Sequence, residues 1–155
     1  MQRATRTLPK AEAVDATVAL TVTLDLEGRR KRRHVVRAAE GEDVLIDLAE
    51  PPQLKDGDGL VLADGRVARV VAEAEALTAV TAGPGCPLVK LAWHLGNRHL
   101  AVQFDEDRLL IRRDHVIEAM LAGLGARLAH LEAPFDPEPG AYDPHHGHGA
   151  GHEHG

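Results

Sequence analysis

The sequence predicts an α+β protein of two small domains: an N-terminal all-β sandwich or barrel-like unit, then a ferredoxin-like βαββαβ unit, followed by a disordered His-rich tail. Short alternating segments separated by turns fill the first half, and apolar residues at helical spacing appear in the second. The last residues carry no large apolar side chain. The predicted ranges are 1–74, 75–135 and 136–155.

Period-two alternation defines the first domain. Ala16 to Leu26 alternates apolar and polar residues, which places its aliphatic side chains on one face of a strand. Gly28 and the basic run Arg29–Arg33 predict a turn, and we expect the charged run to be a solvated hairpin tip. Asp64-Gly65 is a strong hairpin signal. Further strands are expected at His34–Arg37, Asp43–Leu48, Leu60–Leu62 and Val67–Ala72.

The second domain begins near residues 73–76 and includes two helices. Pro87 suits the first turn of the first helix, and Gly96-Asn97 is expected to supply the left-handed residues that close it. Asp114 is a natural N-cap for the second helix, which Gly125 ends. The apolar stripe of that helix is Val116, Ile117, Met120, Leu121 and Leu124. Strands at Leu77–Thr81, Leu100–Phe104, Leu109–Ile111 and Ala126–Glu132 complete the ferredoxin-like order.

The composition changes from Ala133 onward. Four prolines interrupt regular structure, and after Tyr142 no apolar side chain is larger than alanine. A segment of this kind buries too little surface to offset its ordering entropy, so we expect it to be disordered.

Composition excludes several classes of protein. The chain has 155 residues and a net charge of −6, which argues against a dedicated nucleic-acid binder. No apolar run approaches the ~18 residues of a membrane helix, and Met1–Lys10 lacks a signal-peptide stretch. The single cysteine, Cys86, excludes an internal disulfide. We therefore expect a soluble, cytoplasmic protein. Charge is uneven, with +5 over residues 1–37 and −11 over the rest.

Histidines are the most informative residues. The chain has ten, and five fall in the last eleven positions. His-rich tracts are typical of metal binding, and the spacing and Glu153 fit a six-histidine purification tag poorly. Nitrogen and oxygen ligands suit nickel, copper, zinc and cobalt, and composition does not choose among them. The tail histidines are His145, His146, His148, His152 and His154.

Three further histidines are candidate ligands. His94 lies off the apolar stripe of its predicted helix, and His99 follows the helix end. His115 comes directly after the Asp114 cap. For each of them, an ordinary surface position is the competing interpretation. His34 and His130 are expected to be strand residues without a chemical role.

The string His94-Leu95-Gly96-Asn97-Arg98-His99, followed by Val102-Gln103, Asp114-His115-Val116 and the histidine-ended tail, resembles the UreE family of urease accessory proteins. The resemblance spans nearly the whole chain. It implies a cytoplasmic homodimer, formed through the C-terminal domain, which delivers Ni²⁺ to the urease assembly complex through an accessory GTPase (UreG).

The resemblance also assigns roles to the histidines. His99 is the nickel ligand where two protomers meet, and His94 and His115 are secondary metal positions. Arg113 stands where some relatives carry another histidine, and its charge is expected to weaken a site at His115.

Three other functions compete with this one. An enzyme is disfavoured, because no nucleophile elbow, P-loop, dinucleotide fingerprint or metalloprotease motif is present. A storage or buffering protein for divalent metals, with no dedicated recipient, has the same composition. Arg29–Arg33 is the only candidate for binding an acidic surface or nucleic acid, and it lacks interleaved aromatic residues.

Overall fold

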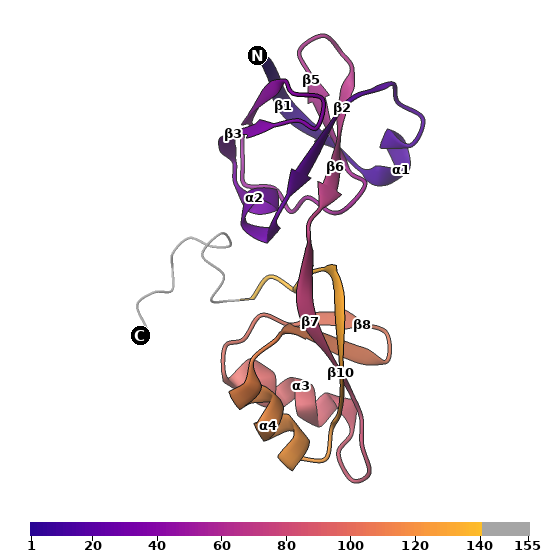
Figure 1. The fold of residues 1–155 in the computed structure, drawn as a ribbon, viewed down its shortest axis with the longest axis vertical. Coiled ribbons are helices and arrows are strands. Elements are labelled where there is room, and N and C mark those ends of the chain that lie inside the picture. Colours follow the sequence, from indigo (N-terminus) through magenta and orange to yellow (C-terminus); the bar gives the residue numbers. More distant parts are fainter. Residues whose placement is uncertain (141–155) are drawn as a thin grey trace. The chain divides into compact units, whose positions relative to one another are not determined.

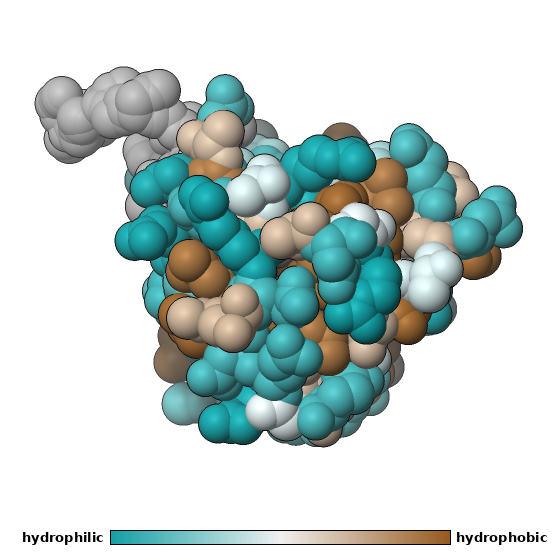
Figure 2. Space-filling model, turned by 90° about the horizontal axis from the view of Figure 1, so that it is seen from above, coloured by the Kyte–Doolittle hydropathy of each residue, from teal (hydrophilic) through white to brown (hydrophobic). Residues whose placement is uncertain are grey.

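The computed structural model describes residues 1–140, and the five tail histidines lie outside this range. The chain divides between Glu73 and Ala74 into two compact units (Figure 1). No helix among the described residues is long and apolar enough to cross a membrane. On the face seen in Figure 2, hydrophilic side chains interleave with smaller hydrophobic areas.

A six-stranded sheet forms the first unit, in the order β2-β6-β5-β1-β4-β3. The pairs β1/β4 and β2/β6 are parallel, and the other pairs are antiparallel. The N–H of Ala39, just after one edge strand, donates to the carbonyl oxygen of Thr21 in the other edge strand, so the sheet curls. This confirms the barrel-like class. The strands are Gln2–Leu8 (β1), Val18–Leu24 (β2), Arg33–Arg37 (β3), Asp43–Asp47 (β4), Gly59–Leu62 (β5) and Val67–Ala72 (β6).

The alternation in the sequence accounts for the core of this unit. In β2, Leu20, Val22 and Leu24 are buried on one face, and Val44 and Ile46 of β4 join them in the same cluster. Because no large aromatic residue takes part, the cluster is built from aliphatic side chains. Burial of this kind stabilises a fold by about 25 cal/mol per Å² of apolar surface.

Three elements of this unit were not expected from the sequence: β1, and the short helices α1 (Lys10–Ala13) and α2 (Leu26–Arg30). Asp25 caps α2, because its carboxylate accepts a 2.7 Å hydrogen bond from the Gly28 N–H. The helix turns Arg29 and Arg30 inward, where only 1% and 7% of their surfaces are exposed. The expectation of a solvated basic hairpin tip is therefore wrong for these two arginines.

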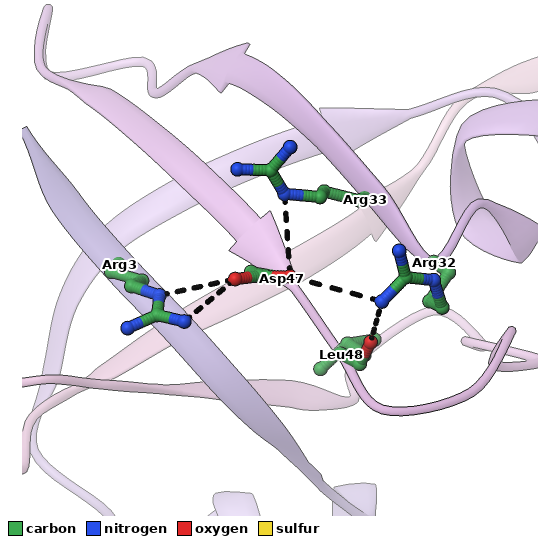
Figure 3. Close-up of polar contacts among 5 residues, drawn as sticks. All are labelled: Arg3, Arg32, Arg33, Asp47 and Leu48. Atoms are coloured by element: carbon green, nitrogen blue, oxygen red, sulfur yellow. Dashed lines mark hydrogen bonds and ion pairs between the residues drawn. The ribbon is translucent and has the colours of Figure 1, made fainter.

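The exposed remainder of the basic run joins an ion-pair network on the sheet (Figure 3). Asp47 of β4 lies 2.7 Å from the Arg3 guanidinium, 3.4 Å from that of Arg33 and 3.9 Å from that of Arg32. The hydrogen bond from Arg3, with the charges of all three arginines, lowers the pKa of Asp47. Since three cations surround one carboxylate, the network keeps a net positive charge.

The second unit has the predicted ferredoxin-like fold. Its antiparallel sheet has the order β10-β7-β9-β8, and the two helices lie on one side of it (Figure 1). Leu91 and Leu95 of the first helix and Ile117 and Leu121 of the second pack with Val80 and others in one apolar cluster. The elements are Ala74–Thr81 (β7), Leu88–Asn97 (α3), Gln103–Asp105 (β8), Arg108–Arg112 (β9), His115–Gly123 (α4) and Arg127–Pro134 (β10).

Three local expectations for this unit are corrected. Val116 is 62% exposed and does not belong to the buried stripe of α4. The strand expected at Leu100–Phe104 is shorter and begins at Gln103. Residues 133–138 were expected to be disordered, but β10 runs through Pro134, and Phe135 is fully buried.

Candidate metal centre

His99 occupies an unusual backbone conformation at the end of α3. Its φ is +57°, in the left-handed region. Its N–H donates to the Gly96 carbonyl oxygen at 3.0 Å, and the Leu100 N–H donates to that of Leu95 at 3.4 Å. This pair of bonds is a Schellman motif, with His99 at the position where glycine is usual.

The prediction that Gly96-Asn97 supplies the left-handed end of α3 is wrong. The helix continues through Asn97, and Arg98 is its C-cap with φ −99°. The reversal falls instead on His99, and it leaves the His99 side chain exposed. A left-handed conformation is costly for a residue with a Cβ atom, and such strain is concentrated at functional sites.

His94 lies near the C-terminal end of α3 and is half-buried. Its ring makes an edge contact with Trp93, with the centroids 5.0 Å apart. Trp93 itself is 62% exposed, and Val89, one turn earlier on the same helix, is 77% exposed. The exposed side of α3 therefore carries an apolar strip, Val89 and Trp93, that ends one turn or more before His99.

His115 is the first residue of α4 and is exposed. As predicted, Asp114 caps this helix, and its carboxylate accepts hydrogen bonds from the N–H groups of Val116 at 2.9 Å and Ile117 at 3.1 Å. Glu118 accepts a 3.1 Å hydrogen bond from the Asp114 N–H, which closes the cap from the other side. These contacts fix the backbone at His115.

Glu118 also contacts His130, for which no chemical role is expected from the sequence. The His130 Nε2 lies 2.8 Å from one Glu118 carboxylate oxygen, and the buried Thr78 hydroxyl donates to the other at 3.0 Å. The hydrogen bond to His130, followed by those from Asp114 and Thr78, outweighs desolvation and lowers the pKa of Glu118. Periodicity cannot reveal this contact, because it joins α4 to the edge strand β10.

The structure does not gather the predicted histidines into one site. Among residues 1–140, no three His, Cys, Asp or Glu side chains lie together in a group that could hold a metal ion. His94, His99 and His115 of the second unit therefore do not form such a group within the part of the chain that the structure describes. Arg113 is exposed beside the Asp114 cap. The tail candidates His145, His146, His148, His152 and His154 lie outside the described residues.

Comparison with known proteins relates both units to one family. The model of the UreE urease accessory protein N-terminal domain matches residues 2–73, and that of the C-terminal domain matches residues 75–155. This chain belongs to the UreE family of urease accessory proteins. The two family models meet where the chain divides into its two units.

Curated members of the UreE family cover most of the chain. The urease accessory protein UreE of Bradyrhizobium sp. (strain ORS 278) is 52% identical over 96% of this chain and 71% of its own length. The protein of the same name from Chelativorans sp. (strain BNC1) is 49% identical over 86% of this chain and 87% of its own length. That of Paracoccus denitrificans (strain Pd 1222) is 49% identical over 83% and 77%.

Proposed function

We propose that this protein is a nickel-binding metallochaperone that captures Ni²⁺ and delivers it to the urease apoprotein assembly complex, through an accessory GTPase (UreG). The observation that carries the proposal is His99, an exposed imidazole held by a strained helix end in a member of a urease accessory family. The protein acts as a carrier in the cytoplasm and catalyses no reaction of its own.

A homodimer formed through the second unit would complete the His99 site. One imidazole binds a divalent ion weakly, and a two-fold axis beside His99 supplies a second one without any further residue. The exposed strip formed by Val89 and Trp93 supports this arrangement, because it offers apolar surface on the helix that leads to His99. A second copy of the chain would cover that strip.

The tail histidines would supply the remaining ligands. A covalent tether holds His145 and its neighbours at a high effective concentration near the body of the protein. His94 and His115 would act as secondary positions, the latter weakened by the charge of the neighbouring Arg113. Moderate affinity suits a carrier, which has to release its ion, whereas a closed four-ligand site would suit a structural role.

A general store or buffer for nickel, copper, zinc or cobalt is the alternative function. The His-rich composition of the tail favours it, since imidazole binds all four ions and the usual affinity order places copper above nickel and zinc. The two functions differ in whether a dedicated recipient exists. Capture of the purified accessory GTPase UreG by the nickel-loaded protein would support a carrier, and failure to bind it would support a buffer.

Calorimetric titration with Ni²⁺ tests the site itself. Three proteins are compared: the full chain, the chain without residues 144–155, and the shortened chain with His99→Ala. We expect the shortened chain to lose some nickel ions and keep the tightest one, and the His99→Ala variant to lose that ion as well. If the last protein binds one ion per dimer as tightly as its parent, the nickel site is elsewhere.

A further inference from the structure

The outward side of strands β1, β4 and β3 carries a concentration of arginine side chains. In the ladder between β3 and β4, Val36 pairs with Val44 and His34 pairs with Ile46, and both β4 residues belong to the buried core cluster. Successive side chains of a strand point to opposite faces, so the alternate pairs of this ladder lie on the outward side. We call this surface the arginine face. Its residues are Arg3, Arg32, Arg33, Val35, Arg37, Asp43 and Asp47.

Asp47 holds three guanidinium groups in place at one end of the arginine face (Figure 3). The Nε and Nη2 groups of Arg3 donate to Asp47 Oδ2 at 3.2 and 2.7 Å, and the Nε of Arg33 lies 3.4 Å from Oδ1. The Nη1 of Arg32 donates to the Leu48 carbonyl oxygen at 2.9 Å. Only 16% of the Asp47 side chain is exposed, whereas the three arginine side chains are 47–59% exposed. A guanidinium carries several N–H donors, so each of these groups is fixed on one side and keeps donors for a ligand on the other.

An exposed aliphatic side chain lies next to these arginines. Val35 is 54% exposed, and Arg33 and Arg37 flank it on the same side of β3. Arg37 forms a 3.5 Å ion pair with Asp43 of β4. Protein interfaces typically combine an apolar centre with arginine, which is enriched there relative to the rest of the surface. The arginine face therefore has the composition of a protein-binding surface.

Charge indicates the kind of partner. The four arginines and two aspartates of the arginine face leave a net charge of +2 at pH 7, in a chain whose residues beyond 37 carry −11. An acidic protein is therefore attracted to this face and repelled by most of the remaining surface, which orients the encounter. Nucleic acid fits less well, because residues 1–73 contain no phenylalanine, tyrosine or tryptophan on which bases could stack.

We propose that the arginine face is a docking surface for the acidic face of a partner protein. Carboxylates of the partner bind the guanidinium groups of Arg3, Arg32 and Arg33, and its apolar side chains cover Val35. Asp47 already shows that a carboxylate fits between these guanidinium groups. That the partner is the recipient of nickel rests on the proposed function, whereas the binding of carboxylates to the arginine face can be measured without it.

Replacing the three arginines by lysine separates hydrogen-bonded recognition from charge alone. Lysine keeps the positive charge but loses the planar fork of N–H donors that binds a carboxylate through two hydrogen bonds. A surface that acts only through its charge tolerates Arg3→Lys/Arg32→Lys/Arg33→Lys. We expect this triple variant to bind an acidic ligand about five-fold more weakly than the parent protein, because an exposed ion pair is worth little more than this.

Val35→Thr provides a second test that changes no charge. Threonine keeps the β-branched shape that suits a strand and removes apolar surface, so we expect several-fold weaker binding. Two matched controls lie outside the arginine face. Val71→Thr alters an exposed valine of β6, and Arg66→Lys alters an arginine paired with Asp64. Both controls should leave binding unchanged.

NMR titration of the metal-free, full-length protein measures the affinity and locates the binding surface. The probe is a short peptide of alternating glutamate and valine, and the matched probes are the same peptide with glutamine for glutamate and a single-stranded oligothymidylate of equal negative charge. We expect the acidic peptide to shift the backbone amide signals of Arg33, Val35 and Asp47 and to bind about ten-fold more tightly than either matched probe. Equal affinity for the oligothymidylate, or unchanged peptide affinity in both the triple lysine variant and Val35→Thr, would overturn the proposal.

Nickel titration of the same variants distinguishes this proposal from the carrier function. The arginine face lies in the first unit and His99 in the second, so nickel affinity should be the same in every variant. If the parent protein binds neither nickel nor the accessory GTPase, the carrier function fails, while the peptide titration still decides whether the arginine face binds carboxylates.

Discussion

The strained end of α3 makes a quantitative prediction about His99. Replacing His99 by glycine should stabilise the metal-free protein relative to His99→Ala, although both variants lose the imidazole. The Schellman hydrogen bonds at this helix end use backbone atoms alone, so both variants keep them. The comparison therefore isolates the backbone conformation at φ +57° from every contact of the side chain.

The expected magnitude follows from the cost of that conformation. A left-handed residue with a Cβ atom costs about 1–2 kcal/mol, which glycine avoids. Glycine also gains more freedom in the unfolded chain, which returns about 0.4–1 kcal/mol of that advantage. We therefore expect the free energy of unfolding to be about 1 kcal/mol higher for His99→Gly than for His99→Ala. For a chain of this length, the difference corresponds to roughly 2–4 °C in Tm.

Urea unfolding in the presence of a chelator measures this difference, at one fixed protein concentration for every variant. Glu106 provides a matched control, because its φ of +55° places the same kind of strain in the loop between β8 and β9. Glu106→Gly should stabilise the protein by a similar amount and leave nickel binding intact. His99→Gly should gain stability and lose the tightest nickel ion.

Two outcomes would contradict this reasoning. Equal stability of the glycine and alanine variants would show that the helix end carries no backbone strain in solution. Unchanged nickel affinity in His99→Gly, at any stability, would separate the strained position from the metal site. Strain at this position would then have a structural explanation rather than a functional one.

Three further predictions follow from other parts of the molecule. Burial first, and the charge of Lys31 second, lower the pKa of His34 against the opposing effect of Asp25, so the folded state binds fewer protons than the unfolded state. The free energy of unfolding should therefore fall as the pH drops below about 6.5. Urea unfolding at pH 5 and pH 8 measures this fall, which should be smaller in His34→Leu. Nickel affinity should also weaken as pH falls through about 6.5, because protons compete for the imidazole nitrogens, and equal affinities by calorimetry at pH 5.5 and 7.5 would exclude histidine ligands. Reversing the charges of Arg32 and Arg33 should slow association with the accessory GTPase, and the effect should depend on salt concentration. Stopped-flow kinetics measure the association rate, with Arg66→Glu as the control. An unchanged association rate at low salt would discard a role for this basic surface.

The sequence alone was sufficient for the fold class and for the family. Period-two alternation located five of the six strands of the first unit, because one face of each strand packs into the core. The strand β1 was missed because most of its side chains are exposed. Its place in the sheet depends on pairing with β4 and β5, which no local pattern reveals.

The sequence also determined the identity of the candidate ligands. The linear sequence shows the number of histidines, their clustering at the end of the chain and the string that ends at His99. Whether His94, His99 and His115 bind nickel stays a prediction. The structure adds that these three do not form one group within residues 1–140 of a single chain.

Only the tertiary structure decided how particular residues are used. It placed the reversal of α3 on His99 rather than on Gly96-Asn97, because the chain turns where Leu100 can pack back against the core. The fold buries the side chain of Arg29, although this residue belongs to a run of five cations. A backbone hydrogen bond between Glu138 and Val102 orders residues 135–138, although residues 134–139 include three prolines. In each case the deciding interactions join residues far apart in the chain or across a helix end. Local composition sets the conformational preference of a segment. Packing and long-range hydrogen bonds together contribute more free energy than that preference, so they determine the conformation that the segment adopts in the folded protein.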